Sequence, residues 1–148
     1  MLIWQDVDVT WFLVTNRKDN THLRIFGRTA VVRIEQLAEA AISHEALLLR
    51  SLTQDFLGAR PSLRDYPRPV TINFEILAAS ASLIELLAQR SNQEPPSWTK
   101  EVGALPQPLH LVKSAATMKH LRALCEQQSP EPLRERGFYA PPNFLESA

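Results

Sequence analysis

The sequence predicts an α+β fold. We expect an N-terminal β-hairpin or three-stranded meander packed on two or three helices, with a proline-rich C-terminal segment wrapped over them. Three observations lead to this expectation. β-forming residues are concentrated in residues 2–34, apolar residues recur at helical spacing within residues 35–90, and all eleven prolines lie between Pro61 and Pro142. Because proline fixes φ and lacks a backbone donor, it excludes helix interiors and central strands from much of the second half.

The predicted strands lie at the beginning of the chain. Residues 2–15 are rich in Val, Ile, Thr, Trp and Phe, which is typical of one long or two short strands. A polar turn over 16–20 separates them from a second run over 21–26, and this arrangement predicts a hairpin. Residues 29–34 could add a third strand.

Helical spacing begins near Glu35 and continues to Gly58, a residue type that often ends helices. Serine disfavours helix interiors, so this run is either one helix or two helices that break near Ser43. The next helix starts near residues 71–73 and ends near Arg90. Its apolar stripe is broad enough to predict a buried central helix, and consists of Phe74, Leu77, Ala81, Ile84 and Leu87.

Prolines divide the remainder into short pieces. Ser97 can cap a single turn over 98–102, residues 105–112 should be extended, and Ser114 can cap a third helix that ends near Gln128. A proline-punctuated tail follows over 130–148. We therefore expect an α+β core at 1–92 and a helical appendage at 93–148 that packs on it.

Composition narrows the function classes. Sixteen Lys and Arg balance sixteen Asp and Glu, which argues against a nucleic-acid partner. Cys125 is the only cysteine, so an internal disulfide or a cysteine-based zinc cluster cannot form. The N-terminus does not resemble a signal peptide, and no apolar run approaches the roughly 18 residues of a membrane span. We expect a cytoplasmic protein without a membrane segment or a cofactor.

Asp6 and Asp8 form one alternative site. In a strand their carboxylates would share one side, about 6–7 Å apart, and such a pair can hold Mg²⁺ with nucleotide phosphates. The run Asp6-Val7-Asp8-Val9 is similar to the acidic strand of nucleotidyltransferases, which implies a magnesium-dependent enzyme. The Gly-Ser element that precedes this strand in that family is missing here. A solvated strand face is the simpler interpretation.

Residues 35–56 form a second alternative. The run from Glu35 to Glu45 resembles the first helix and turn of a helix-turn-helix, which implies a following helix in the DNA major groove. The turn glycine of that motif is missing. The would-be reading helix is mostly apolar and offers Arg50 as its main basic side chain. A core helix is therefore the simpler interpretation of these residues.

The remaining residues with catalytic or metal-binding chemistry do not form a pattern. The four histidines are scattered and no two share a metal-ligand spacing. Cys125 shares the apolar side of its helix with Met118 and Leu121, which indicates a packed and unreactive thiol. We assign no catalytic and no metal-binding residue.

The C-terminal segment is the main candidate for function. It combines arginine and aromatic residues, the types that anchor protein interfaces, with prolines that limit the entropy lost on binding. The expected function is a non-enzymatic interaction protein, of a regulatory or antitoxin-like kind, that binds another protein. The hairpin edge could also pair with a second copy. An equal alternative is that the aromatics close the protein's own core. The expected contacts are Trp98, Arg136, Phe138, Tyr139 and Phe144.

Residues 94–145 also resemble the endings of small bacterial proteins to which no reaction is assigned. The resemblance consists of Glu94-Pro95-Pro96-Ser97-Trp98, Leu105-Pro106-Gln107-Pro108, Leu124-Cys125-Glu126, Ser129-Pro130-Glu131-Pro132-Leu133-Arg134 and Asn143-Phe144-Leu145. It implies a bacterial, cytosolic origin and transfers no catalytic residue.

Overall fold

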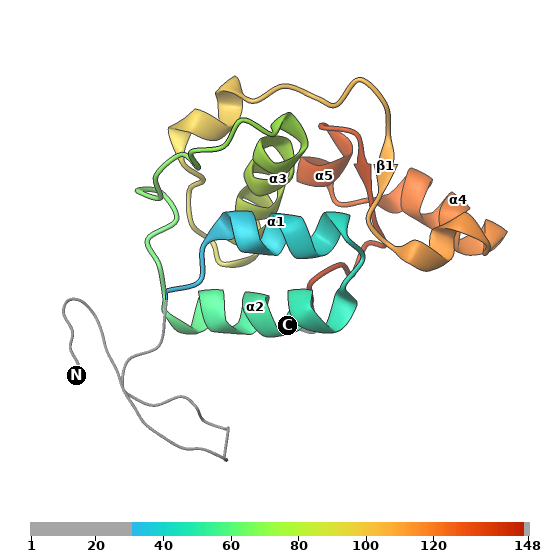
Figure 1. The fold of residues 1–148 in the computed structure, drawn as a ribbon, viewed down its shortest axis with the longest axis horizontal. Helices are drawn as coiled ribbons and strands as arrows, with labels where there is room; N and C mark the ends of the chain where they lie inside the picture. Colours follow the sequence, from blue (N-terminus) through green and yellow to red (C-terminus); the bar gives the residue numbers. More distant parts are fainter. Residues whose placement is uncertain (1–30, 147–148) are drawn as a thin grey trace, which may run out of the picture. The chain divides into compact units, whose positions relative to one another are not determined.

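Helices dominate the part of the chain that the structure, a computed structural model, describes, which is residues 31–146 (Figure 1). The chain from Val32 onward belongs to one compact unit. The elements of this part are α1 (Ile34–Ile42), α2 (Ala46–Gly58), α3 (Phe74–Arg90), the 3₁₀ turn η1 (Ser97–Glu101), β1 (Leu109–His110), the 3₁₀ turn η2 (Lys113–Ala116), α4 (Lys119–Gln128), α5 (Glu131–Arg134) and β2 (Phe138–Tyr139).

The first two helices form a hairpin. α1 begins after Arg33, whose backbone N–H donates to Gln36 Oε1 at 2.8 Å. It ends at Ile42, with Ser43 as its C-cap. The turn continues through His44, whose backbone lies in the left-handed region with φ of 61°. α2 then runs back along α1 (Figure 1). Of the two alternatives that the sequence left open over this run, one helix or two, the structure shows two helices that break at Ser43.

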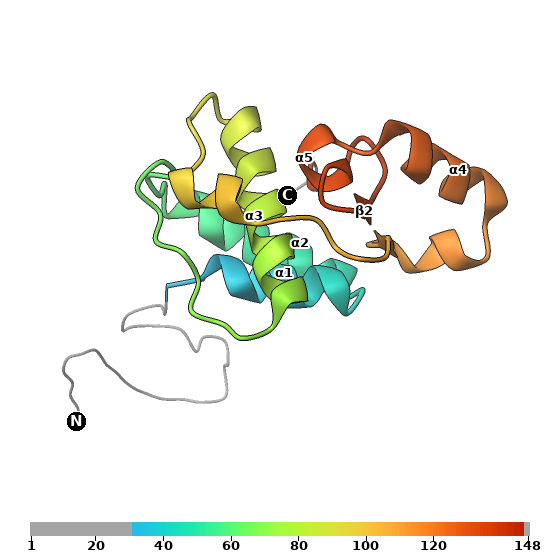
Figure 2. The ribbon, with the colours of Figure 1, turned by 90° about the horizontal axis from the view of Figure 1, so that it is seen from above.

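α3 is the central helix. It begins after Asn73, whose Oδ1 accepts from the Ile76 N–H at 3.2 Å. Eleven of its 17 residues are buried. α1, α5 and η1 all pack against it (Figure 2). Small residues over 78–82 allow these neighbours to approach closely. The predicted buried central helix with its end near Arg90 is confirmed.

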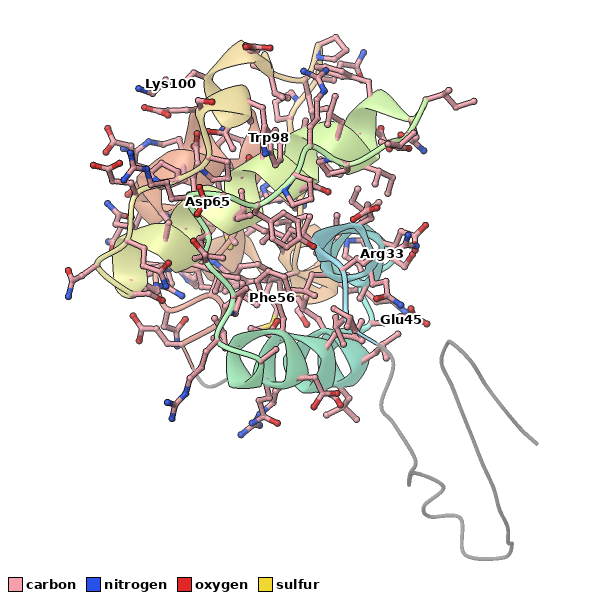
Figure 3. The ribbon with its side chains drawn as sticks, turned by 90° about the vertical axis from the view of Figure 1, so that its left-hand side faces the viewer. Arg33, Glu45, Phe56, Asp65, Trp98 and Lys100 are labelled. Carbon is pink, nitrogen blue, oxygen red and sulfur yellow. The ribbon has the colours of Figure 1, made fainter. Side chains whose placement is uncertain are left out.

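One hydrophobic cluster, called the main hydrophobic cluster below, contains residues from both sides of the predicted boundary at position 92. Phe56 points inward from α2 (Figure 3), and its ring lies 5.6 Å from that of Tyr66. Side chains from α1 and α3 complete this half of the cluster. The second half of the chain adds Val102, Leu111, Leu133, Phe138 and Ala140.

A short parallel sheet joins two segments of the C-terminal third. Leu109 of β1 pairs with Phe138 of β2, and His110 pairs with Tyr139. The Leu109 N–H donates to the Gly137 carbonyl at 2.8 Å, and the Leu111 N–H donates to the Tyr139 carbonyl at 2.9 Å. Parallel strands need a long crossover, which η2, α4 and α5 supply.

Gly137 makes the turn from α5 into β2. Its φ of 86° lies in the left-handed region, where a Cβ is unfavourable. We expect Gly137→Ala to lower the free energy of unfolding by about 1–2 kcal/mol, measured by urea denaturation. Gly103→Ala is the matched control, because a Cβ there meets nothing within 4 Å and its φ is not positive. Equal effects of the two substitutions would contradict this explanation.

The predicted α+β class is wrong. The only strands among residues 31–146 are β1 and β2, and they form a two-stranded parallel sheet in the C-terminal third rather than an N-terminal meander. The predicted hairpin over residues 2–26 lies outside the described residues. The third strand, over 29–34, is wrong where the structure describes it, because Val31–Arg33 form no strand and Ile34 begins α1. Burial of Ile34 against the helices outweighs its β propensity.

Candidate functional site

Arg136 is a buried cation whose partners come from its own chain. Its Nη1 and Nη2 contact the two carboxylate oxygens of Glu85 on α3 at 2.7 and 3.1 Å. Nη2 also donates to the Thr99 carbonyl at 2.6 Å, and Nε donates to the Val102 carbonyl at 3.2 Å. The side chain is 7% exposed. The guanidinium therefore ties the C-terminal segment to α3 and η1.

The two aromatic residues of β2 differ in their surroundings. Phe138 is completely buried and belongs to the main hydrophobic cluster. Tyr139 is partly buried, and its ring lies 5.3 Å from the His110 ring at an angle of 50°. Phe138 thus fills the core, whereas Tyr139 retains some accessible surface.

Phe144 is partly buried against the same cluster. Arg90, at the end of α3, fixes this part of the tail by donating hydrogen bonds to the backbone carbonyls of Phe144 and Pro142. The guanidinium also lies 4.0 Å from the Glu146 carboxylate. The tail is thus held against α3 by two arginines, Arg90 and Arg136.

Trp98 lies in η1 and packs on the connector between α2 and α3 (Figure 3). Its Nε1–H donates to the Tyr66 carbonyl at 2.8 Å. The ring is partly buried. Of the five residues predicted as partner contacts, Arg136 and Phe138 are interior, whereas Trp98, Tyr139 and Phe144 are partly accessible.

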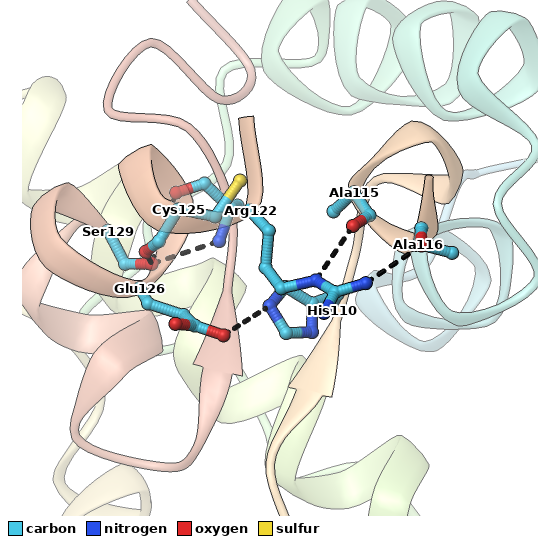
Figure 4. Close-up of polar contacts among 8 residues, drawn as sticks. His110, Ala115, Ala116, Arg122, Cys125, Glu126 and Ser129 are labelled. Atoms are coloured by element: carbon cyan, nitrogen blue, oxygen red, sulfur yellow. Dashed lines mark hydrogen bonds and ion pairs between the residues drawn. The ribbon is translucent and has the colours of Figure 1, made fainter. Parts of the chain in front are cut away.

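His110, at the end of β1, takes part in a group of polar contacts with neighbouring elements (Figure 4). His110 Nε2 lies 3.4 Å from Glu126 Oε2, and the His110 carbonyl contacts His44 Nε2 at 3.0 Å. Cys125 is fully buried nearby on α4. Burial, and then the charge of Glu126, raise the pKa of the Cys125 thiol. A covered and protonated thiol is a poor nucleophile, so the surroundings of Cys125 favour packing over catalysis.

Metal binding finds no support in the part of the chain that the structure covers. Within residues 31–146, no three His, Cys, Asp or Glu side chains are placed to share a metal ion. Asp6 and Asp8 lie outside the described residues, so the nucleotidyltransferase-like alternative is not tested by this geometry.

The most exposed apolar feature lies between α2 and α3. Val70 and Ile72 are fully exposed, at 99% and 107%, and Phe74 at the start of α3 is 44% exposed. We call these three residues the exposed apolar strip. Exposed apolar residues that lie close together mark binding surfaces more often than isolated ones do, and these three lie within five consecutive positions. Sequence reasoning missed the strip because it assigned Phe74 to the buried stripe of α3; the alternation Val70-Thr71-Ile72-Asn73-Phe74 after two prolines was the available signal.

The strip follows two prolines and runs into the capped start of α3. Pro67 and Pro69 fix φ in the connector that leads to it. Between Ile72 and Phe74, Asn73 caps α3, and the Asn73 N–H donates to Thr71 Oγ1 at 3.1 Å. The strip is therefore presented in a restricted conformation.

α1 and α2, which cover the residues compared with a helix-turn-helix, are joined by a tight turn in which His44 has a left-handed backbone conformation. The exposed charges on α2 are Arg50 and Asp55, which have opposite sign. This face lacks the excess of cations that attracts phosphates. DNA binding stays an untested alternative, for which duplex affinity measured against salt concentration is the test.

No known protein-family model matches the sequence, and no curated protein or solved structure shows significant similarity to it. The helices within residues 31–146 include none with the length and apolar character needed to cross a bilayer.

Proposed function

We propose that this protein is a non-enzymatic interaction protein that binds another protein through the exposed apolar strip. The observation that carries the proposal is the exposure of Val70, Ile72 and Phe74 within five consecutive residues. Apolar side chains in water favour a partner that covers them, by about 25 cal/mol for each Å² buried.

Rigidity of the strip supports this role. Association costs the entropy of every segment that becomes ordered, so a surface fixed in advance binds with a smaller penalty. The prolines before the strip and the Asn73 cap within it supply that order. A mobile loop of the same composition would bind less tightly.

The C-terminal segment has a supporting part in this proposal. Arg136 and Phe138 are engaged in the interior, where Arg136 binds Glu85 of α3 and Phe138 fills the main hydrophobic cluster. Trp98, Tyr139 and Phe144 keep partial exposure and stay proposed as additional contacts. A regulatory or antitoxin-like role would follow if the bound protein loses its activity on binding.

Ile72→Asp tests the proposal. The substitution places a charge where an apolar side chain would be buried, so we expect partner affinity to fall by about 10-fold or more. Tagged wild-type and variant proteins would be used to capture proteins from cells, and each protein retained would be quantified by mass spectrometry. The partner so identified would then be purified and its Kd measured against both proteins.

Leu47→Asp is the matched control, because Leu47 is 83% exposed but lies on α2, outside the strip. The proposal expects the partner to be lost with Ile72→Asp and kept with Leu47→Asp. Thermal melts of both variants should match the wild type, since neither side chain is buried. A purified partner that binds Ile72→Asp within twofold of the wild type would overturn the role of the strip. A dimeric wild type that Ile72→Asp makes monomeric would identify the partner as a second copy.

A further inference from the structure

Residues 112–128, which comprise η2 and α4, form what we call the α4 lobe. Cys125 is the only buried residue among the ten of α4, whereas most of α3 is buried. Within the described chain, no residue of 112–132 belongs to the main hydrophobic cluster. Both ribbon views place α4 at the edge, away from α1 to α3 (Figures 1 and 2).

Both ends of the lobe are attached at the same place. On the N-terminal side, the Leu111 N–H donates to the Tyr139 carbonyl at 2.9 Å. On the C-terminal side, Ser129 Oγ accepts from the Ala140 N–H at 3.0 Å. Because Tyr139 and Ala140 are adjacent, the lobe leaves the core and returns to it at neighbouring residues. The Ser129 hydroxyl also donates to the Cys125 carbonyl, so the last turn of α4 is tied to this same attachment point.

The polar contacts of the lobe are mainly internal. Arg122 donates to the carbonyls of Ala115 and Ala116, at 3.0 and 2.7 Å (Figure 4). The Met118 N–H donates to the Ser114 carbonyl at 2.9 Å. Among residues 31–146, the side-chain contact that joins α4 to β1 is the ion pair of Glu126 with His110, and both partners are partly exposed to solvent.

We infer that the α4 lobe opens as a unit while the main core stays folded. Regions with few buried apolar contacts and solvent-accessible hydrogen bonds open at lower free energy than the core does. Cys125 lies outside the main cluster, so opening uncovers its thiol without disrupting α1 to α3. This inference is independent of the role proposed for the apolar strip.

Thiol labelling under native conditions tests the inference. Cys125 in the wild-type protein would be labelled with iodoacetamide at several urea concentrations below the unfolding transition, and the label quantified by mass spectrometry. The reference is the variant Cys125→Ala/Ala81→Cys, whose thiol replaces a fully buried methyl group on α3. Each rate is divided by the rate of the same cysteine in unfolded protein. We expect Cys125 to react about 100-fold faster than the reference, with a weak dependence on urea.

Hydrogen exchange of the wild-type protein gives a second measurement that does not depend on the folding of the variant. Amides of α4 should exchange about 100-fold faster than the buried amides of α3. If Cys125 and α4 instead show the same protection and the same urea dependence as α3, the lobe opens only with global unfolding and the inference is wrong.

Discussion

Arg136→Met is expected to lower the free energy of unfolding by about 3–5 kcal/mol, because it leaves Glu85 as a largely buried charge without its partner. The substitution also removes the donors that satisfy the carbonyls of Thr99 and Val102. Small domains are stable by about 5–15 kcal/mol, so this one change removes a large share of the total. Urea denaturation followed by circular dichroism measures it.

Arg64→Met is the matched control. Arg64 pairs with Glu94 at 3.6 Å, but the two side chains are 74% and 78% exposed. Water screens such a pair, so the control should change stability by less than about 1 kcal/mol. The double variant Glu85→Met/Arg136→Met should recover part of the loss, because no buried charge is left. A single variant as stable as the control would show that the buried ion pair does not hold the C-terminal segment.

Phe138→Ala is expected to have the second large effect: it should lower the free energy of unfolding by about 3–5 kcal/mol. Phe138 is completely buried, and the cavity left by its ring would lie within the main cluster. The same urea experiment measures the loss. If the substitution abolishes folding altogether, the more conservative Phe138→Leu should give a folded protein of intermediate stability.

The control for Phe138 is Phe74→Ala, which removes the same ring from a site that is 44% exposed. Its cost should be clearly smaller, because less apolar surface is returned to water. Phe74→Ala should instead weaken partner binding, since Phe74 belongs to the apolar strip. Similar stability losses at the two positions would contradict the assignment of Phe138 to the core.

Local sequence signals predicted the helices well. The start of α3 after Asn73 and its end at Arg90 follow from capping preferences and apolar periodicity, whereas the same signals left open whether the run before Gly58 breaks at Ser43. The hydrogen bonds of a helix join residues that are close in sequence, so local patterns carry much of the information about where helices begin and end. The third helix was predicted less accurately, because the chain first forms η2 and α4 begins only at Lys119.

The sequence could not predict the features that depend on contacts between distant residues. Strands of two residues are too short to show alternation, so the pairing of β1 with β2 left no local pattern. Arginine is usually exposed, and only the fold shows that Glu85 and two carbonyls surround Arg136. The exposure of Ile72 is likewise decided by how the connector enters α3.

The order in which the core residues are synthesised has a consequence for the cell. Glu85 leaves the ribosome well before Arg136, and α3 emerges before α5, which packs against it. Translation adds about 5–20 residues per second, so the nascent chain spends seconds with this helix uncovered. We expect copies that terminate prematurely, near residue 128, to be bound by chaperones or degraded by proteases.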